Sequence, residues 1–307
     1  MRILGILALA FLGSGPALAD VELPTKFSNQ GTVGNTRHNL TQRQSSGGGP
    51  SNTIMNPYRN DYEEVCVYCH TPHGGNAAIQ LPLWNRTIKA STTYQTYDTL
   101  GTSTLTQPVT PPGPNSLACL SCHDGTTAVD SIINMPGGRS DFYQASQATA
   151  QDNTFLNRWN NSSGPDATTH LGLDAGNPAS SCFACHSSSA GIVGAGATDF
   201  KAYAIGTDLR NDHPVGIRFP TVSGAGTDFK TPTATRGNLR FFDTNGNSRP
   251  DKDEIRLYDT GDGYEVECGS CHDPHGVPSG GPGSVFRPTF LRVANTGSAV
   301  CLTCHSK

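Results

Sequence analysis

Apolar residues are scattered along this chain of 307 residues, and few stretches repeat them at a regular spacing. A spacing near 3.6 residues marks an amphipathic helix, and alternation marks a strand with one buried face. Stretches rich in Gly, Pro and Ser, such as SSGGGPSN, TPPGPNS and GVPSGGPGS, interrupt the chain and indicate loops. The pattern therefore predicts a mostly irregular fold with short helices.

The longest apolar run stands at the start of the sequence. Arg2 precedes the run ILGILALAFL, and Ala17-Leu18-Ala19 has the small-x-small form of a cleavage site. These features are typical of a secretory signal peptide, which we place at residues 1–19. No later run approaches the roughly 18 apolar residues of a membrane span. We expect an exported protein without a membrane span, with residues 20–307 forming one domain.

The composition raises the question of how such a chain folds. Charged residues make up 15% of it, and it contains 35 glycines and 21 prolines. A chain of this kind buries too few apolar side chains to offset the entropy lost on folding. Disorder is therefore expected unless something other than side chains supplies the core. The formal net charge of −4 gives no basic surface for nucleic acid.

Cysteine gives the strongest signal in the sequence. All ten cysteines fall into five copies of C-x-x-C-H, a pattern typical of covalent haem attachment. Two thiols on one helical turn can bond the two vinyl groups of one porphyrin, and the histidine that follows can bind its iron. We number the copies motifs 1 to 5: Cys66, Cys69 and His70; Cys119, Cys122 and His123; Cys182, Cys185 and His186; Cys268, Cys271 and His272; Cys301, Cys304 and His305.

Two other interpretations of the cysteines explain less. Five disulfides are possible in an exported protein, but they do not require a histidine after every pair. C-x-x-C is also half of a zinc site, but five halves cannot pair evenly. We therefore predict five covalently bound haems of type c. They would also supply the missing core, which predicts a multihaem cytochrome c wrapped around a stack of five haems that collapses without them.

The histidines outside the motifs match the remaining coordination positions in number. Five irons with one motif histidine each would leave five open axial positions, and five histidines remain. This equality predicts two histidine ligands on every iron, although each residue could instead be a surface or turn imidazole. The remaining histidines are His38, His73, His170, His213 and His275.

Motifs 1 and 4 continue as C-x-x-C-H-x-P-H. His272 should bind the haem of its own motif. His275 follows too closely to pass round the porphyrin edge to the opposite face of the same haem, and Pro274 turns the chain out of the helix. We therefore expect His275, and by the same argument His73, to ligate a neighbouring haem.

His38 lies in a polar N-terminal arm, residues 20–60, ahead of motif 1. It has three possible roles: a loose tail residue, a ligand of a haem in the same chain, or a ligand of a haem in another copy of the protein.

The sequences C-x-x-C-H-T-P-H and C-x-x-C-H-D-P-H-G resemble the doubled C-x-x-C-H multihaem cytochromes. With the RHNL arm, the loop-rich body and the terminal motif, the chain resembles extracellular cytochromes of metal-reducing microbes. Some of these polymerise into filaments, the cytochrome nanowires. The resemblance covers less than a fifth of the chain. It implies one continuous haem stack, self-association through haem-bearing ends with a histidine shared between subunits, and electron exchange with other multihaem cytochromes or extracellular acceptors.

The longest gap between motifs, residues 187–267, contains a second candidate site. Its oxygen-bearing residues follow the spacing of a calcium loop of the EF-hand type. Positions 1, 3, 5, 9 and 12 are side chains and position 7 is a carbonyl: Asp243, Asn245, Asn247, Asp251, Glu254 and Arg249. Ser248 stands where glycine usually makes the sharp turn, and the flanking sequence does not indicate two helices. The alternative is a turn cluster without an ion.

Three functions remain to be compared. An electron conduit needs close haems whose irons are closed by two imidazoles, and we favour an extracellular filament subunit over a soluble periplasmic shuttle. A multihaem reductase needs an iron with an open position, whereas the histidine count leaves no iron short. A disulfide-stapled binding module would need no haem. We expect an electron-transfer protein rather than an enzyme.

Overall fold

The computed structural model describes residues 31–40, 62, 64–103, 105–136, 171–190, 199–211, 214–277 and 289–306. The predicted signal peptide, most of the N-terminal arm, His170 and His213 lie outside these residues. The described part contains three short α-helices: α1 at Pro114–His123, α3 at Cys268–Cys271 and α4 at Ala299–Cys304. Single 3-10 turns form the rest of its helical structure: Val33–Asn35, Ser91–Thr93, Tyr97–Leu100, Pro178–Ser180, Cys182–Ala184, Ser188–Ala190, Lys201–Tyr203, Leu209–Asn211 and Thr296–Ser298.

A small antiparallel sheet, which the prediction of a mostly irregular fold with short helices did not include, occupies the long gap between motifs 3 and 4. Its order is β1-β5-β4-β3-β2, and every neighbouring pair is antiparallel. The strands span Ile217–Arg218, Ala234–Arg236, Leu239–Phe241, Arg256–Asp259 and Tyr264–Val266 in chain order. Strands of two to four residues are too short to show a clear alternation, which explains why the pattern did not predict them.

The buried side chains form three separate clusters instead of one core. The first packs Trp84, Tyr94, Leu117 and Leu209 around the end of α1. The second gathers around Tyr62, Tyr68 and Ile132, and the third packs Phe219, Phe242, Ile255 and Leu257 beside the sheet. Each cluster also contacts cysteines of the motifs, namely Cys69, Cys268, Cys271 and Cys304.

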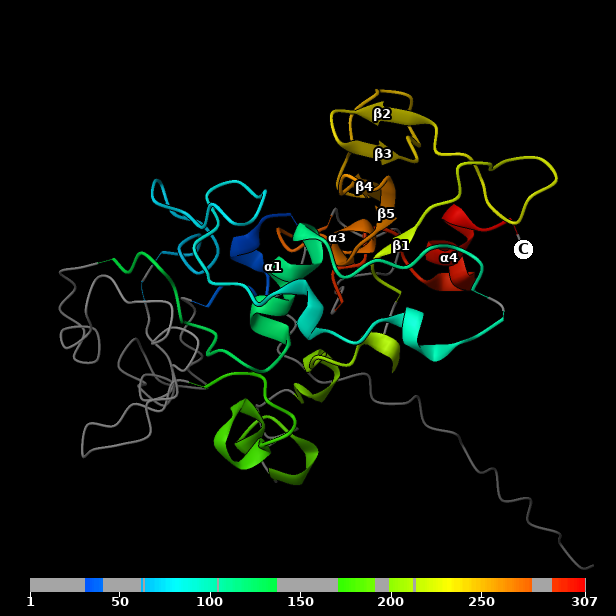
Figure 1. The fold of residues 1–307 in the computed structure, drawn as a ribbon. Helices are drawn as coiled ribbons and strands as arrows, with labels where there is room; N and C mark the ends of the chain where they lie inside the picture. Colours follow the sequence, from blue (N-terminus) through cyan, green and yellow to red (C-terminus); the bar gives the residue numbers. More distant parts are fainter. Residues whose placement is uncertain are drawn as a thin grey trace, which may run out of the picture.

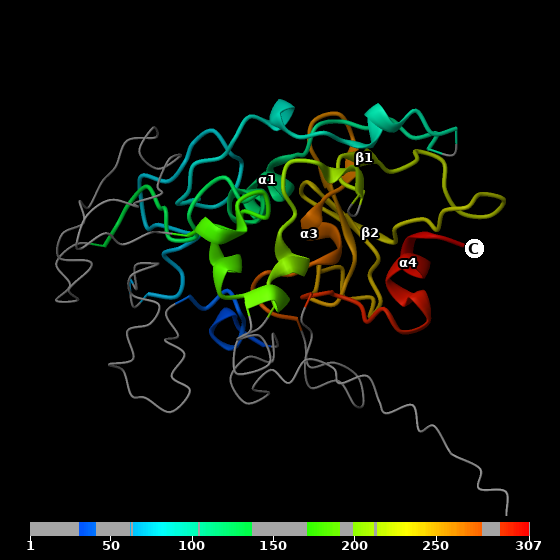
Figure 2. The ribbon, with the colours of Figure 1, turned by 90° about the horizontal axis from the view of Figure 1, so that it is seen from below.

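The helices that carry motifs 2 and 4 lie side by side. Figures 1 and 2 show α3 between α1 and the sheet, and α3 contacts both α1 and β4. Val300 and Cys304 of α4 pack against the third cluster, which places motif 5 on the other side of the sheet from α1 (Figure 1). Within the described residues, no helix has the length and apolar character needed to cross a membrane.

Candidate functional site

Every C-x-x-C-H motif forms one helical turn. The backbone N–H of the histidine donates to the carbonyl of the first cysteine in motifs 1, 3, 4 and 5, at 2.8, 2.8, 3.1 and 2.9 Å. In motif 2 the same residues form the end of α1, which closes at His123. Both cysteines of each motif therefore share a turn with the histidine, as their spacing predicts. None of the ten cysteines is paired in a disulfide.

One buried carboxylate joins the helices of motifs 2 and 4. Glu267, which is 1% exposed, caps the N-terminus of α3 through a reciprocal pair of hydrogen bonds with Ser270. Its other contacts are at the start of α1: Gly113 N donates to Oε1 at 3.0 Å, and the Ser116 hydroxyl donates to Oε2. A negative group is favourable at the N-terminus of a helix. Glu267 occupies that position for two haem-binding helices, although burial raises its pKa to about 7.

A buried arginine anchors the opposite end of α1. Arg86 is 1% exposed, and its guanidinium donates to the Ser121 carbonyl at 2.8 Å and to those of Ala128 and Val129 at 2.9 and 2.8 Å. The last carbonyls of a helix carry partial negative charge, which a cation stabilises. Arg86 therefore fixes the turn of α1 that ends in His123.

The segment that precedes Arg86 also holds motif 1. The Pro82 carbonyl accepts a hydrogen bond from His70 Nδ1 at 2.7 Å, and Asn85 N donates to the Cys69 carbonyl at 2.8 Å. Trp84 packs edge-on against the His70 ring, with the ring centres 5.7 Å apart. Among the described residues, no hydrogen-bond partner reaches the buried indole N–H of Trp84.

The structure brings together two pairs of histidines from distant parts of the chain. His70 of motif 1 faces His275, with ring centres 6.2 Å apart and ring planes at 13°. His123 of motif 2 faces His38, with ring centres also 6.2 Å apart and planes at 69°. We call these the first and second imidazole pairs. Each combines one motif histidine with one of the additional histidines.

The separation within each pair fits one metal ion. Metal–imidazole bonds are about 2 Å long and each nitrogen lies about 1 Å from its ring centre, so an ion held between two imidazoles separates the ring centres by about 6 Å. The Nδ1 atoms are already engaged: those of His38 and His123 donate to the carbonyls of Pro274 and Tyr203 at 3.1 and 2.7 Å. This arrangement leaves Nε2 to face the metal and fixes the ring orientation.

The charge state of the second pair also suits a metal. Loss of hydration, together with the nearby His123 and His275, lowers the pKa of His38 to about 4, and loss of hydration also lowers the pKa of His123. Both imidazoles are therefore neutral near pH 7, which is the form that ligates iron.

The three remaining motif histidines, His186, His272 and His305, contact groups of other kinds. His186 stacks on Phe200 at 4.0 Å, His305 lies 4.9 Å from Phe229, and Nδ1 of His272 donates to the Thr289 carbonyl. The structure places His73 in the turn after motif 1, where its carbonyl accepts from Thr71 Oγ1 at 2.9 Å. The predicted ligation by His73, His170 and His213 stays a prediction.

Packing contacts give the spatial order of four motifs. Cys69 of motif 1 packs against the cluster that contains Leu117 and Leu120 of α1, the helix of motif 2. In turn, α1 contacts α3, the helix of motif 4. Cys271 of motif 4 and Cys304 of motif 5 pack against the same third cluster. The order is therefore 1-2-4-5.

Motif 3 joins this row through the segment at residues 199–206. Phe200 N donates to the His186 carbonyl of motif 3 at 2.8 Å, and Ile205 N donates to the His123 carbonyl of motif 2 at 2.9 Å. Motif 3 therefore lies beside motif 2.

The candidate calcium loop connects β3 to β4. Asp243 Oδ2 accepts from Ser248 N at 2.8 Å, which lowers the pKa of Asp243, and Ser248 adopts a positive φ of 57°. The turn that glycine usually makes is thus present with serine. Asp251 Oδ2 accepts from the Asn245 and Asn247 amides at 2.8 and 2.7 Å. Within the described residues, no three His, Cys, Asp or Glu side chains converge as a metal-binding group.

Sequence reasoning missed Asp273, Glu267 and Arg86, which orient or anchor the site without carrying a motif. A weak signal existed for Asp273 alone, since it lies between two expected ligands.

Comparison with known families supports the haem interpretation. The doubled CXXCH motif family matches residues 263–307, which contain motifs 4 and 5. No curated protein matches the chain. The motifs and this match identify a multihaem c-type cytochrome. Covalently bound haem c and a role in electron transfer follow from that class.

Proposed function

We propose that the chain is a pentahaem cytochrome that conducts electrons along a row of haems, each with two histidine ligands. The observation that carries the proposal is the presence of two imidazole pairs with ring centres 6.2 Å apart. In it, His70 and His275 hold the iron of the haem on motif 1, and His123 and His38 hold that of motif 2. Bound haem c supplies one-electron chemistry, while the protein sets ligation, burial and orientation.

The proposed path follows the order of the motifs. Successive motifs are neighbours in the order 1-2-4-5, so the haems that they bind would also be neighbours. Motif 3 joins the path beside motif 2. Because two imidazoles close each iron, the proposal makes the protein an electron carrier and not a reductase.

Removing one additional histidine tests the proposal. His275→Ala should leave the motif 1 iron with one axial ligand, and His38→Ala should do the same at motif 2. Each variant is expected to convert one haem in five from low spin to high spin, and the double variant two in five. Electron paramagnetic resonance of the oxidised proteins and intact mass provide the readouts.

Three results would contradict the proposal. One is a wild-type spectrum that already contains a high-spin haem, which would favour a reductase. Another is an unchanged low-spin spectrum in both variants. The third is an intact mass that lacks the increment of five haems.

The proposal includes export and assembly into an extracellular filament. It is supported by the low charge, the Gly-rich chain and the resemblance to filament-forming cytochromes. We do not assign His38 to a neighbouring subunit, because it faces His123 of its own chain. Electron microscopy of the secreted protein tests assembly, and particles of one size at all concentrations would favour a shuttle. Secretion should yield a mature chain that begins at Asp20.

We also propose that calcium stiffens the loop between β3 and β4. Glu254 is buried at 1%, and its carboxylate accepts from Thr244 N and Asp251 N at 2.7 and 3.0 Å, so it can close the loop from its end. Calorimetric titration with calcium should show binding that Glu254→Gln weakens at least tenfold. Asp253→Asn removes a charge from a position between the proposed ligands and serves as the control. The absence of a binding signal in the wild type would contradict the site.

A further inference from the structure

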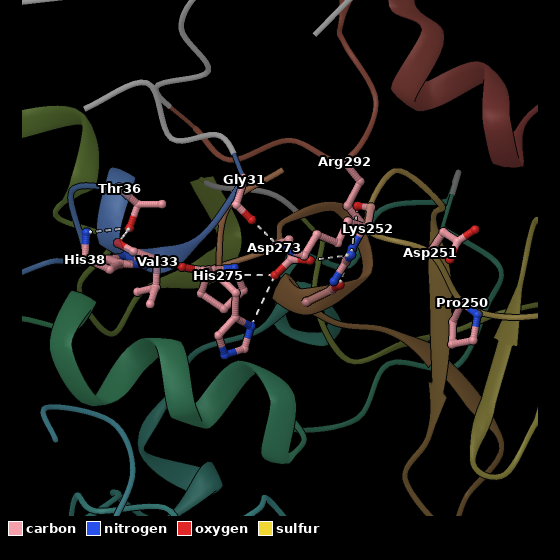
Figure 3. Close-up of polar contacts among 12 residues, drawn as sticks. Gly31, Val33, Thr36, His38, Pro250, Asp251, Lys252, Asp273, His275 and Arg292 are labelled. Atoms are coloured by element: carbon pink, nitrogen blue, oxygen red, sulfur yellow. Dashed lines mark hydrogen bonds and ion pairs between the residues drawn. The ribbon is translucent and has the colours of Figure 1, made fainter. Parts of the chain in front are cut away.

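Four consecutive residues, His272 to His275, contact the sites of three haems in the proposed function. His272 is the motif histidine of motif 4, and His275 belongs to the first imidazole pair. The Pro274 carbonyl accepts from His38 Nδ1 of the second pair at 3.1 Å. Figure 3 shows His275 beside Asp273 of this turn.

Asp273 holds the turn and orients His275. Its Oδ1 accepts from the backbone N–H of His275 at 3.0 Å and from the ring Nδ1 at 3.3 Å. Its Oδ2 accepts from Arg292 Nη1 at 3.1 Å (Figure 3). The Asp273 side chain is 9% exposed, and the ring of His275, at 61%, is the more open partner. Arg292 is itself fixed by the Gly269 and Lys252 carbonyls at 3.1 and 3.0 Å.

The carboxylate remains ionised in this position. Burial opposes the charge, but the Arg292 guanidinium, 3.1 Å from Oδ2, and the backbone N–H of His275, which donates to Oδ1, favour the ionised form. The group that accepts from the His275 ring is thus an anion at neutral pH.

This ring contact differs from those of the other described imidazoles. Nδ1 of His38, His70, His123 and His272 donates to a backbone carbonyl in each case. Only His275 among these five donates to a carboxylate. The corresponding position in motif 1 is Thr71, which hydrogen-bonds the carbonyl of His73 instead of its ring.

We propose that Asp273 is a positioning residue that sets the reduction potential of the haem on motif 1 through His275. The inference rests on the proposed function, because it needs His275 as an iron ligand. A carboxylate that accepts from the distal ring nitrogen raises the basicity of a metal-bound histidine. A more basic ligand stabilises the ferric state, so Asp273 lowers the potential of this haem relative to haems whose ligands donate to carbonyls.

The test measures the five potentials of the holoprotein by voltammetry in wild type and in Asp273→Asn, which keeps the shape and removes the charge. One transition should shift to higher potential by clearly more than the other four. Asp273→Glu, which keeps the carboxylate, should have a potential closer to that of the wild type than Asp273→Asn has. Asp259→Asn, which removes an exposed carboxylate at the end of β4, is the control for overall charge.

Two outcomes would overturn the inference: no shift in Asp273→Asn, or a uniform shift of all transitions that Asp259→Asn reproduces. If Asp273→Asn does not retain its haems, Asp273→Thr replaces it, because it gives motif 4 the residue that motif 1 carries. The potential of one haem should again shift upwards more than the other four. The spin state of His275→Ala distinguishes a failure of the proposed role of Asp273 from a failure of the ligand assignment. If it is high spin and Asp273→Asn shows no shift, only the role of Asp273 fails. If it stays low spin, the ligand assignment itself fails.

Discussion

The two imidazole pairs reach the same separation by different structural means. His123, in the second pair, ends a ten-residue helix whose first turn is bonded to Glu267 and whose last turn is bonded to Arg86. Both members of the first pair lie on turns, one supported by the Pro82 carbonyl and the other by Asp273. Their ring planes differ as well, near parallel in the first pair and near perpendicular in the second.

The comparison indicates that a turn can hold a histidine of an imidazole pair as well as a helix can. Buried charged groups support His123, on a helix, and His275, on a turn, whereas the neutral Pro82 carbonyl supports His70. The second pair should therefore be sensitive to groups that hold α1, and the first pair to the turn at Asp273.

The largest expected difference between the pairs is electronic and needs no substitution. Near-perpendicular imidazole planes leave two iron d orbitals almost equal in energy, whereas near-parallel planes separate them. The oxidised holoprotein should therefore show one strongly anisotropic low-spin signal from motif 2 and a rhombic one from motif 1. Electron paramagnetic resonance of wild type, His38→Ala and His275→Ala assigns them. The reverse assignment would contradict the planes at 69° and 13°.

Arg86→Met should have the largest effect on stability. The substitution keeps an apolar stem but leaves the buried carbonyls of Ser121, Ala128 and Val129 without their donor. We expect a loss of at least about 3 kcal/mol in the free energy of unfolding. The signal of the motif 2 haem should disappear first on heating. Lys89→Met, which removes a positive charge from the same segment, is the control, and equal losses in both variants would contradict the anchoring role.

Glu267→Gln should change how stability depends on pH. Glu267 loses its proton near pH 4.5 when unfolded and near 7 when folded. Between these values the folded state binds more protons, so the free energy of unfolding falls as pH rises through the window, by something on the order of 3 kcal/mol. The Gln variant should lack this fall. Denaturant titrations from pH 4.5 to 8 measure it, with Glu64→Gln as the exposed control. Parallel curves for wild type and Glu267→Gln would show that Glu267 does not titrate there.

Lys252→Met should have the smallest effect. Lys252 Nζ donates to the Gly31 carbonyl at 2.5 Å and so helps to hold the segment that carries His38 (Figure 3). Because the contact is exposed, its loss should cost less than about 1 kcal/mol. A faster hydrogen exchange in residues 31–40 is the expected sign. Lys230→Met removes a similar bond, to the Leu302 carbonyl within motif 5, and should leave hydrogen exchange in residues 31–40 unchanged.

The sequence was informative wherever short-range chemistry decides the outcome. The spacing of each motif predicts the helical turn that the structure contains, and the extra histidine after Pro274 was assigned to a different haem because its tether is short. His38 had three possible roles from sequence, and its contact with His123 favours a ligand within the same chain.

The features that the sequence did not predict depend on contacts between distant segments. Spacing alone could not show that His275 faces His70, because no local signal relates motif 4 to motif 1. Arg86 and Glu267 resemble ordinary charged residues until folding buries them. The sequence did not predict the sheet, because strands this short are defined by their pairing more than by an alternation of apolar and polar residues.

The first imidazole pair joins residues about 200 positions apart, and this has a consequence for biosynthesis. A chain made from its N-terminus presents Cys66, Cys69 and His70 for haem attachment long before His275 exists. If His275 ligates this iron, as proposed, the earliest haem would carry a vacant coordination position, open to small molecules such as peroxide, until about nine tenths of the polypeptide has been made. Chains interrupted before residue 275 would retain that vacancy. Under the proposed ligation, a complete chain therefore protects the iron of the first haem from reacting with small molecules.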